Sequence, residues 1–273
     1  MDRPNAVLSV DMEWFSHIPA YRNARGSMTE NDVGRSGVEL LLELFGNADA
    51  TSTFFVVAKI AERHPELLSR ILESGHEIGS HTYDHVHLTE VDENDRHEQL
   101  QASRETLEDA TGASVTGFRA PSFDIAEDHF ETLDVTGYDY DSSIVPCRSI
   151  PGWYGGTHTV QRPVPADQAV DGASSSITEL PVAVMPGLRL PLTGTWLRFF
   201  GVRYVLWGMR LLSHRGITPI LYVHPWELVD LPAVDGVPRR VYWRTGAWMR
   251  RAITRILNSR FAFVPMRSLT ETD

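Results

Sequence analysis

Short runs of apolar residues recur along the chain and are separated by longer segments of mixed polarity. Each run contains β-branched or aromatic residues and is bounded by polar or turn-forming residues, which is typical of buried strands. We expect strands at residues 6–10, 51–57, 76–80, 115–119, 138–141, 177–184, 219–223 and 261–264.

The segments between these runs repeat their apolar residues with helical spacing. Pro65 suits the first turn of a helix, and Gly75 and Gly112 suit positions just beyond helix ends. We expect helices at residues 38–45, 65–73, 93–110, 128–135, 204–214 and 246–257.

Alternation of strands and helices predicts an α/β fold with a parallel sheet covered by helices. A length of 273 residues is ordinary for a barrel of this class, which commonly has about 250. Two polar, glycine-bearing stretches, residues 16–36 and 146–176, interrupt the alternation, and we expect binding loops or decorations there. No repeat and no second domain is evident.

Composition and charge limit which partners the protein can bind and in which compartment it is expected to act. The formal net charge of −11 opposes binding to nucleic acid or to an anionic membrane surface through long-range repulsion. The single cysteine, Cys147, excludes an intrachain disulfide. The first residues lack the features of a signal peptide, and no run approaches the ~20 apolar residues of a membrane span. We therefore expect a cytoplasmic protein, acting there or at the inner membrane face, that is not an integral membrane protein.

His81 and His85 are the clearest candidates for metal ligands. Imidazoles four residues apart fall on one face of a helical turn, within reach of one ion. The preceding residues suit a short buried strand, so the pair should lie where a strand gives way to a loop. The chain has 11 histidines, and chance proximity is the alternative for this pair taken alone.

The first predicted strand ends in two carboxylates, Asp11 and Glu13. Strand alternation points both to one side and Met12 to the other. Such a pair is costly beside an apolar strand unless it holds a cation or transfers protons. The alternative is that these residues already belong to a solvated loop.

Further polar side chains stand at strand ends, where parallel barrels carry their catalytic residues. His224 suits a general acid or base, or else a hydrogen-bonded core histidine. Arg119 suits a partner for a carboxylate, either structural or orienting a catalytic base. Asp141 alternates with tyrosines and fits either the site or a solvent-facing position.

Five of these segments together resemble the polysaccharide deacetylases of carbohydrate esterase family 4. They occur in the family's order: SVDME at 9–13, HTYDH at 81–85, RAPS at 119–122, YDSS at 140–143 and LYVHP at 221–225. The resemblance is close over residues 6–145 and looser over 177–269. The second half resembles a subgroup found with exopolysaccharide genes, and the first motif has the Asp-x-Glu form.

The resemblance implies one catalytic domain over residues 1–273, folded as a distorted (β/α) barrel of about seven parallel strands. It implies a divalent ion, with Zn²⁺ favoured over Co²⁺, Ni²⁺ or Mn²⁺, bound by Glu13, His81 and His85. Asp11 would be the general base, oriented by Arg119, and His224 the general acid; Asp141 is a further catalytic candidate. The partner would be an N-acetylated amino-sugar glycan or its precursor.

Two departures from the common family pattern affect the site. Met12 separates two carboxylates that are usually adjacent aspartates, so the roles of Asp11 and Glu13 could be divided differently. Ser122 replaces a tyrosine, which changes the shape of the pocket. Aromatic residues beside the motifs suit stacking on sugar rings, although core packing is the alternative for each. The candidate substrate contacts are Trp14, Ser122, Phe123 and Trp226, and Trp153 lies near the same motifs.

Three functions remain open from the sequence. The first is metal-dependent N-deacetylation of a glycan or its precursor. The second is hydrolysis of a small cyclic or linear amide, as allantoinases and imidases perform. The third is glycan binding by an inactive module, against which the intact set of candidate ligands and catalytic residues argues.

Overall fold

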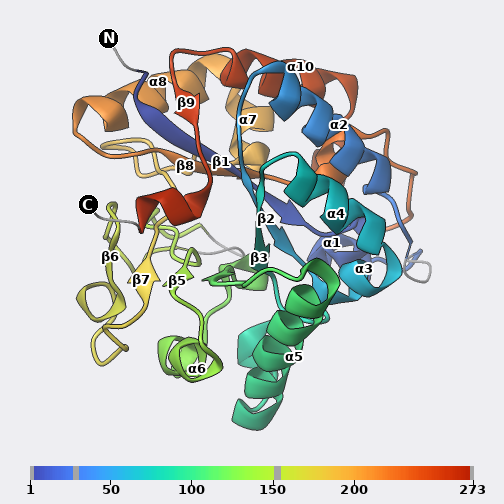
Figure 1. The fold of residues 1–273 in the computed structure, drawn as a ribbon. Coiled ribbons are helices and arrows are strands. Elements are labelled where there is room, and N and C mark those ends of the chain that lie inside the picture. The colour runs from blue at the N-terminus through green and yellow to red at the C-terminus, as the bar shows by residue number, and fades with distance from the viewer. Residues whose placement is uncertain (1–2, 27–30, 151–154, 271–273) are drawn as a thin grey trace.

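The computed structural model describes residues 3–26, 31–150 and 155–270. Their strands form a sheet in the order β6-β7-β5-β4-β3-β2-β1-β8, with β9 also paired to β1 (Figure 1). Neighbouring strands are parallel except β6 and β7, which are antiparallel. The strands are β1 Asn5–Met12, β2 Thr53–Val56, β3 Glu77–Ser80, β4 Gly117–Phe118, β5 Tyr140–Asp141, β6 Val164–Pro165, β7 Thr178–Glu179, β8 Ile220–Val223 and β9 Ala262–Phe263.

The sheet curls until the chain beyond β7 reaches β8. The backbone N–H of Val182 donates to Ile144 at 2.9 Å, and that of Ala183 donates to Ile220 at 2.8 Å. The predicted distorted barrel is therefore confirmed, with an antiparallel β6 in addition. The strand expected at residues 177–184 is regular only at Thr178–Glu179, because the following residues bridge two neighbours instead of pairing along one.

Helices cover the outside of the sheet (Figure 1). Helix α4 begins at Pro65, and α5 ends before Gly112, whose φ of 65° is left-handed, as the sequence predicted. No helix in the described part of the chain is both long and apolar enough to cross a membrane. The α-helices are α1 Pro19–Arg22, α2 Arg35–Asn47, α3 Ala58–Arg63, α4 Pro65–Glu73, α5 Glu93–Thr111, α6 His129–Thr136, α7 Gly194–Phe200, α8 Val202–His214, α9 Arg239–Tyr242 and α10 Ala247–Leu257. Single 3-10 turns are η1 Phe15–His17, η2 Leu88–Glu90, η3 Pro121–Phe123, η4 Ala166–Gln168, η5 Pro225–Leu228 and η6 Met266–Leu269.

The long first strand separates two environments. Leu8, Val10 and Met12 pack into the main core beneath the helices. Val7 packs into a smaller cluster inside the barrel, and alternation places Ser9 and Asp11 on that inner side. Met12 and Asp11 therefore face opposite sides of β1, as predicted, and Glu13 follows the end of the strand.

The interior cluster also closes the barrel at the N-terminal ends of its strands. The buried carboxylate of Glu77 accepts hydrogen bonds from Thr53 at 2.5 Å and from Tyr140 at 2.9 Å. It also accepts the backbone N–H of Arg267 at 3.1 Å, which fixes η6 across this end. The candidate functional site lies at the opposite end of the barrel, at the C-terminal ends of the strands.

Candidate active site

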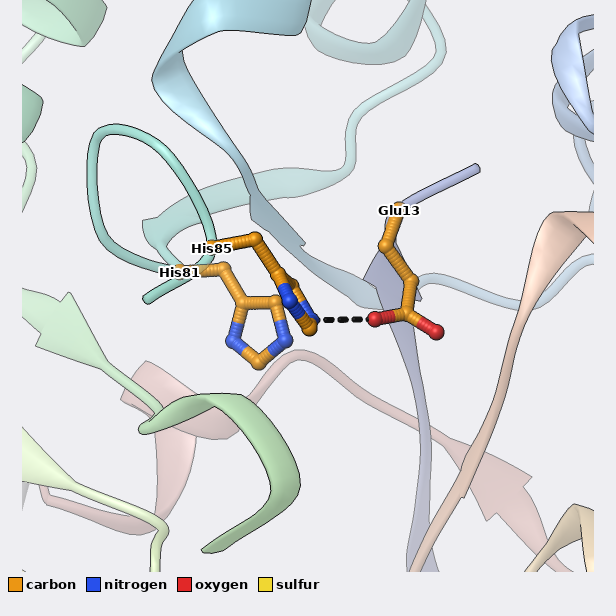
Figure 2. Close-up of side chains that lie close together, drawn as sticks. All are labelled: Glu13, His81 and His85. Atoms are coloured by element: carbon orange, nitrogen blue, oxygen red, sulfur yellow. Dashed lines mark ion pairs between the residues drawn. The ribbon is translucent and has the colours of Figure 1, made fainter. Parts of the chain in front are cut away.

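Three side chains from the ends of β1 and β3 converge on one point (Figure 2). Glu13 follows β1, whereas His81 and His85 lie in the loop after β3. One potential ligand atom from each lies within 4.8 Å of the others, and all three residues are buried. The structure therefore brings the predicted metal ligands together.

The loop after β3 brings the two imidazoles together without a helical turn, so that part of the prediction is wrong. Residues 81–87 form no helix, and Thr82 and His85 have left-handed φ values of 62° and 54°. Non-glycine residues seldom adopt this conformation, which is concentrated at functional sites. The ring of His17 stacks on His85 at 5.4 Å, and Arg22 donates to the His85 carbonyl at 3.1 Å. These contacts hold the loop in its strained form.

A hydrogen bond to the backbone sets which ring nitrogen of His81 can bind a metal ion. Its Nδ1 lies 2.7 Å from the carbonyl oxygen of Arg119. Because a carbonyl only accepts, Nδ1 carries the hydrogen and Nε2 keeps its lone pair. Burial lowers the pKa of His81 to about 4, so the ring is neutral at neutral pH.

The contact between His85 and Glu13 also fits a shared cation. His85 Nε2 forms an ion pair with Glu13 Oε2, yet neither ring nitrogen of His85 has a hydrogen-bond partner in the described structure. Buried ring nitrogens without a hydrogen-bond partner are rare, and a cation shared with Glu13 would give Nε2 of His85 a partner. Burial alone would raise the pKa of Glu13, but His85 and the neighbouring imidazoles bring it well below its usual value. Two imidazoles and a carboxylate suit Zn²⁺.

Asp11 lies beside this triad and is held by Arg119. Arg119 Nη1 donates to Asp11 Oδ1 at 2.6 Å and to Ser9 Oγ at 2.8 Å. Its Nε and Nη2 donate to the carbonyl and hydroxyl of Ser142 at 3.0 and 2.8 Å. The guanidinium is fully buried over the ring of Phe55, so the position of the Asp11 carboxylate is closely defined.

His224 follows β8 and belongs to a chain of charged side chains. Its Nδ1 lies 3.2 Å from Glu227 Oε2, and Glu227 Oε1 lies 2.9 Å from Arg198 Nε. Its Nε2 lies 3.7 Å from Glu13 Oε1. Burial opposes the protonated ring, but Glu227 and Glu13 more than offset this and raise the pKa of His224 to about 9. With its pKa raised in this way, the ring carries its proton at neutral pH.

Sequence reasoning assigned no role to Glu227 or Arg198. Glu227 stands three residues after His224, and both the backbone N–H and the ring of His224 contact its carboxylate. That spacing across a proline-containing turn was a usable signal, because a carboxylate there can reach back to the turn's first residue. Arg198 comes from α7, which gave no clear periodicity.

A pocket of about 540 Å³ opens beside the candidate metal ligands. Asp11, Glu13, His81 and His224 line it, together with Trp226. The indole of Trp226 also donates to Glu13 at 3.0 Å, so this predicted substrate contact additionally positions a candidate ligand.

Two other predicted substrate contacts, Ser122 and Phe123, form a wall of the same pocket. Both have left-handed φ values, 55° and 59°. With His87 they also line an adjoining pocket of about 400 Å³. Ser122 Oγ lies 3.1 Å from His87 Nε2, a polar contact at the position where the family usually has tyrosine.

Trp14 and Asp141 do not line this pocket. Trp14 packs into the main core, on the side of β1 that Met12 faces. Tyr140 points into the barrel, so alternation places Asp141 on the outer face of β5. There Asp141 accepts from Ser143 Oγ at 2.6 Å and lies 3.3 Å from His129 Nε2. Trp153 lies outside the described residues.

Comparison with known proteins matches the two halves of the chain separately. Residues 26–140 match the family described as polysaccharide deacetylase, and residues 142–271 match a domain of unknown function, DUF3473. A peptidoglycan deacetylase of Helicobacter pylori is 30% identical over 113 residues, which are 41% of this chain and 39% of that protein. The chain spans well under half the length of the curated relatives it matches.

Solved structures share the fold over nearly the whole chain. A crystal structure from Mycobacterium smegmatis, assigned to the polysaccharide deacetylases, has a TM-score of 0.67 and 23% identity, with coverage of 98% of this chain and 88% of that one. An allantoinase has a TM-score of 0.65 and 18% identity, with coverage of 98% and 89%.

The match to the deacetylase family covers His81, His85 and Arg119 but neither first-strand carboxylate nor His224. The fold brings those remaining groups to the matched region, because β1 pairs with both β2 and β8. Residues 26–140 therefore match the polysaccharide deacetylase family, and the fold over nearly the whole chain is similar to that of a solved structure assigned to the same family.

Proposed function

We propose that this protein is a metal-dependent hydrolase that removes N-acetyl groups from an amino sugar in a polysaccharide or a glycan precursor. The observation that carries the proposal is the convergence of Glu13, His81 and His85 at the edge of a pocket that Asp11 and His224 also line. Nitrogen and carboxylate ligands of this kind favour Zn²⁺, with Co²⁺, Ni²⁺ and Mn²⁺ as substitutes. The cytoplasmic location expected from the sequence stays a prediction.

Amide hydrolysis requires two proton transfers, and two different residues of the pocket perform them. A divalent ion at the triad would lower the pKa of water and polarise the amide carbonyl. Asp11, fixed by Arg119, accepts the proton of the attacking water. His224 donates a proton to the departing amine, so the C–N bond breaks to give acetate and a free amino group. Glu227 holds Nδ1 of His224, which leaves Nε2 on the side of Glu13.

The extent of the pocket supports a glycan over a small compact amide. The main pocket and its neighbour share His87, Ser122 and Phe123 as lining, which makes room for sugars beyond the reacting one. Phe123 and Trp226 offer aromatic surface for sugar rings. The similarity to an allantoinase lies in the fold, and no feature of the pocket favours its type of substrate.

Acetate release from N-acetylglucosamine oligomers by metal-loaded protein tests the reaction. We expect release from the oligomers and no ring opening of cyclic ureides or imides. The reverse result would assign the protein to small-amide hydrolysis, and no turnover of either class would leave a binding module.

Elemental analysis tests the metal site separately. His81→Ala and His85→Ala should each lose bound metal, whereas His97→Ala on α5, outside the site, should retain it. Equal metal content in all proteins would remove the basis of the proposal.

A further inference from the structure

Charge is unevenly divided along the chain. Residues 1–185 contain 12 basic and 31 acidic residues, whereas residues 186–273 contain 13 arginines, no lysine and five acidic residues. The C-terminal section, residues 186–273, is therefore basic although the net charge of the whole chain is −11. Repulsion from anionic surfaces, which net charge alone predicts, does not extend to a face built from that section.

Helix α8 displays this basic character on its exposed side. Arg203, Trp207, Arg210 and His214 are all exposed and are spaced by four, three and four residues, so they form one stripe. The side chain of Trp207 is 57% exposed. The opposite side of the helix, which includes Val205, is buried in the core. Neither α7 nor α8 contains a carboxylate.

Exposed aromatic rings continue this stripe onto α7. Phe199 and Phe200 are exposed at the end of α7, and the Phe200 ring lies 4.9 Å from that of Tyr204 at the start of α8. Trp243 is also exposed, and its carbonyl accepts a hydrogen bond from Arg198 of α7 at 3.1 Å. The described residues contain four exposed phenylalanines and tryptophans, and all belong to this region. We call it the aromatic–arginine face: Phe199, Phe200, Arg203, Trp207, Arg210 and Trp243.

We propose that the aromatic–arginine face docks on the surface of an anionic lipid bilayer. Aromatic rings on an exposed helix face favour the boundary between headgroups and acyl chains, and flanking arginines bind phosphate headgroups. Acidic residues outnumber basic ones in residues 1–185, so an anionic surface repels that part of the chain. This repulsion orients the molecule with the aromatic–arginine face toward the membrane. A two-fold contact between copies would instead place arginine stripes such as Arg203 and Arg210 close together, with like charges opposed.

Docking would place the pocket at the membrane surface. Thr195, Arg198 and Phe199 of α7 line the pocket, as does Arg240 of α9, so the face and the pocket share an edge at Phe199. The protein would then take its substrate at the bilayer surface. This inference goes beyond the proposed function, because binding to lipid is measured without any turnover.

Flotation of the full chain with lipid vesicles tests the docking directly. We expect binding to phosphatidylcholine vesicles that contain about 30 mol % phosphatidylglycerol and none to phosphatidylcholine alone. Raising the salt from about 0.1 M to about 0.5 M should weaken binding, since screening shortens the range of the attraction. Absence of binding to the anionic vesicles would overturn the proposal.

Two double variants test the face itself. Phe200→Ser/Trp207→Ser removes aromatic surface, and Arg203→Glu/Arg210→Glu reverses charge; each should weaken partitioning at least about tenfold. None of these four residues lines the pocket, so turnover of a soluble substrate should be unchanged.

The control double variant is Gln101→Glu/Val135→Glu, at exposed positions on α5 and α6. Figure 1 shows these helices at the end of the molecule opposite α7 and α8. Vesicle binding of the control should match that of the unaltered protein. Unaltered binding by both face variants would overturn the proposal. So would concentration-dependent dimerisation without lipid that the face variants abolish, because the face would then bind a second copy.

Discussion

The indole Nε1 of Trp226 donates a hydrogen bond of 3.0 Å to Oε1 of Glu13, although the two residues are 213 positions apart. The other carboxylate oxygen of Glu13 faces His85. The hydrogen bond from Trp226 therefore fixes one oxygen of Glu13, and the other oxygen points toward the candidate metal position. A ligand fixed in this way loses little freedom when an ion binds, because its orientation is already set.

Replacing Trp226 with phenylalanine should weaken metal binding about 10- to 100-fold, because the hydrogen bond that orients Glu13 is lost while most of the aromatic surface remains. Titration with Zn²⁺ under a competing chelator measures the change. Trp14→Phe is the matched control, because the Trp14 indole nitrogen has no hydrogen-bond partner among the described residues. Equal Zn²⁺ affinity in the two variants would contradict the orienting role.

Ligand chemistry at strand ends could be identified from the sequence, whereas contacts between distant segments could not. Glu13, His81 and His85 follow apolar runs that are readable locally. The contact between Trp226 and Glu13 depends on the pairing of β1 with β8, in which Val10 lies opposite Val223, and no local pattern encodes that register.

The elements that escaped sequence reasoning are those too short to show a period. Helices α1, α7 and α9 have four to seven residues, so few positions repeat with helical spacing. Strand β5 has two residues, Tyr140 and Asp141, and alternation cannot assign faces to so short a run without knowing which residue faces inward. The predicted place of Asp141 was therefore open until the packing of Tyr140 was known.

Asp11→Asn should retain metal but lose about 10²–10⁴-fold in turnover, since asparagine keeps the size of the side chain but cannot accept the proton of water. Glu13→Gln should instead lose metal, because the carboxylate charge faces two imidazoles. Metal content and acetate release are measured on both variants. Loss of metal from Asp11→Asn together with its retention by Glu13→Gln would reverse the two roles.

Glu179→Gln should make the stability of the protein less sensitive to a rise in pH. Burial and the charge of Asp141 raise the pKa of Glu179 well above its usual value. Stability that depends on its protonated form is complete below the unfolded pKa and is lost as pH rises through the folded pKa. Glutamine does not ionise, and its carbonyl can still accept the N–H of Ile144, which lies 3.1 Å from Glu179.

Urea unfolding of the Glu179→Gln variant and of the unaltered protein at about pH 5, 7 and 9 measures this difference in the free energy of unfolding. The free energy of unfolding of the variant should rise relative to that of the unaltered protein as pH rises. The control, Glu105→Gln, replaces a carboxylate on the surface of α5 and should follow the unaltered protein. Parallel pH profiles for Glu179→Gln and the unaltered protein would show that Glu179 titrates alike in the folded and unfolded chains.

His224→Ala should slow hydrolysis of amides at least about tenfold more than hydrolysis of activated esters, because an amine leaves only when it is protonated. Hydrolysis of amides should also decline as pH rises through the pKa of His224, since only the protonated ring is a donor. Glu227→Gln keeps an acceptor near Nδ1 but removes the negative charge that raises this pKa. The decline should therefore move to lower pH in Glu227→Gln, with the ester profile unchanged.

A glycine pair provides a steric version of the same test. A Cβ at Gly194 would lie 2.3 Å from Glu227 Oε2, whereas a Cβ at Gly46 would meet nothing within 4 Å. Gly194→Ala must therefore displace the carboxylate that holds His224, and amide hydrolysis should fall while the metal content stays constant. Gly46→Ala should change neither quantity. If Gly194→Ala and Glu227→Gln both kept the amide rate and its pH profile, His224 would act without Glu227, and the proton for the leaving amine would have to come from another group in the pocket.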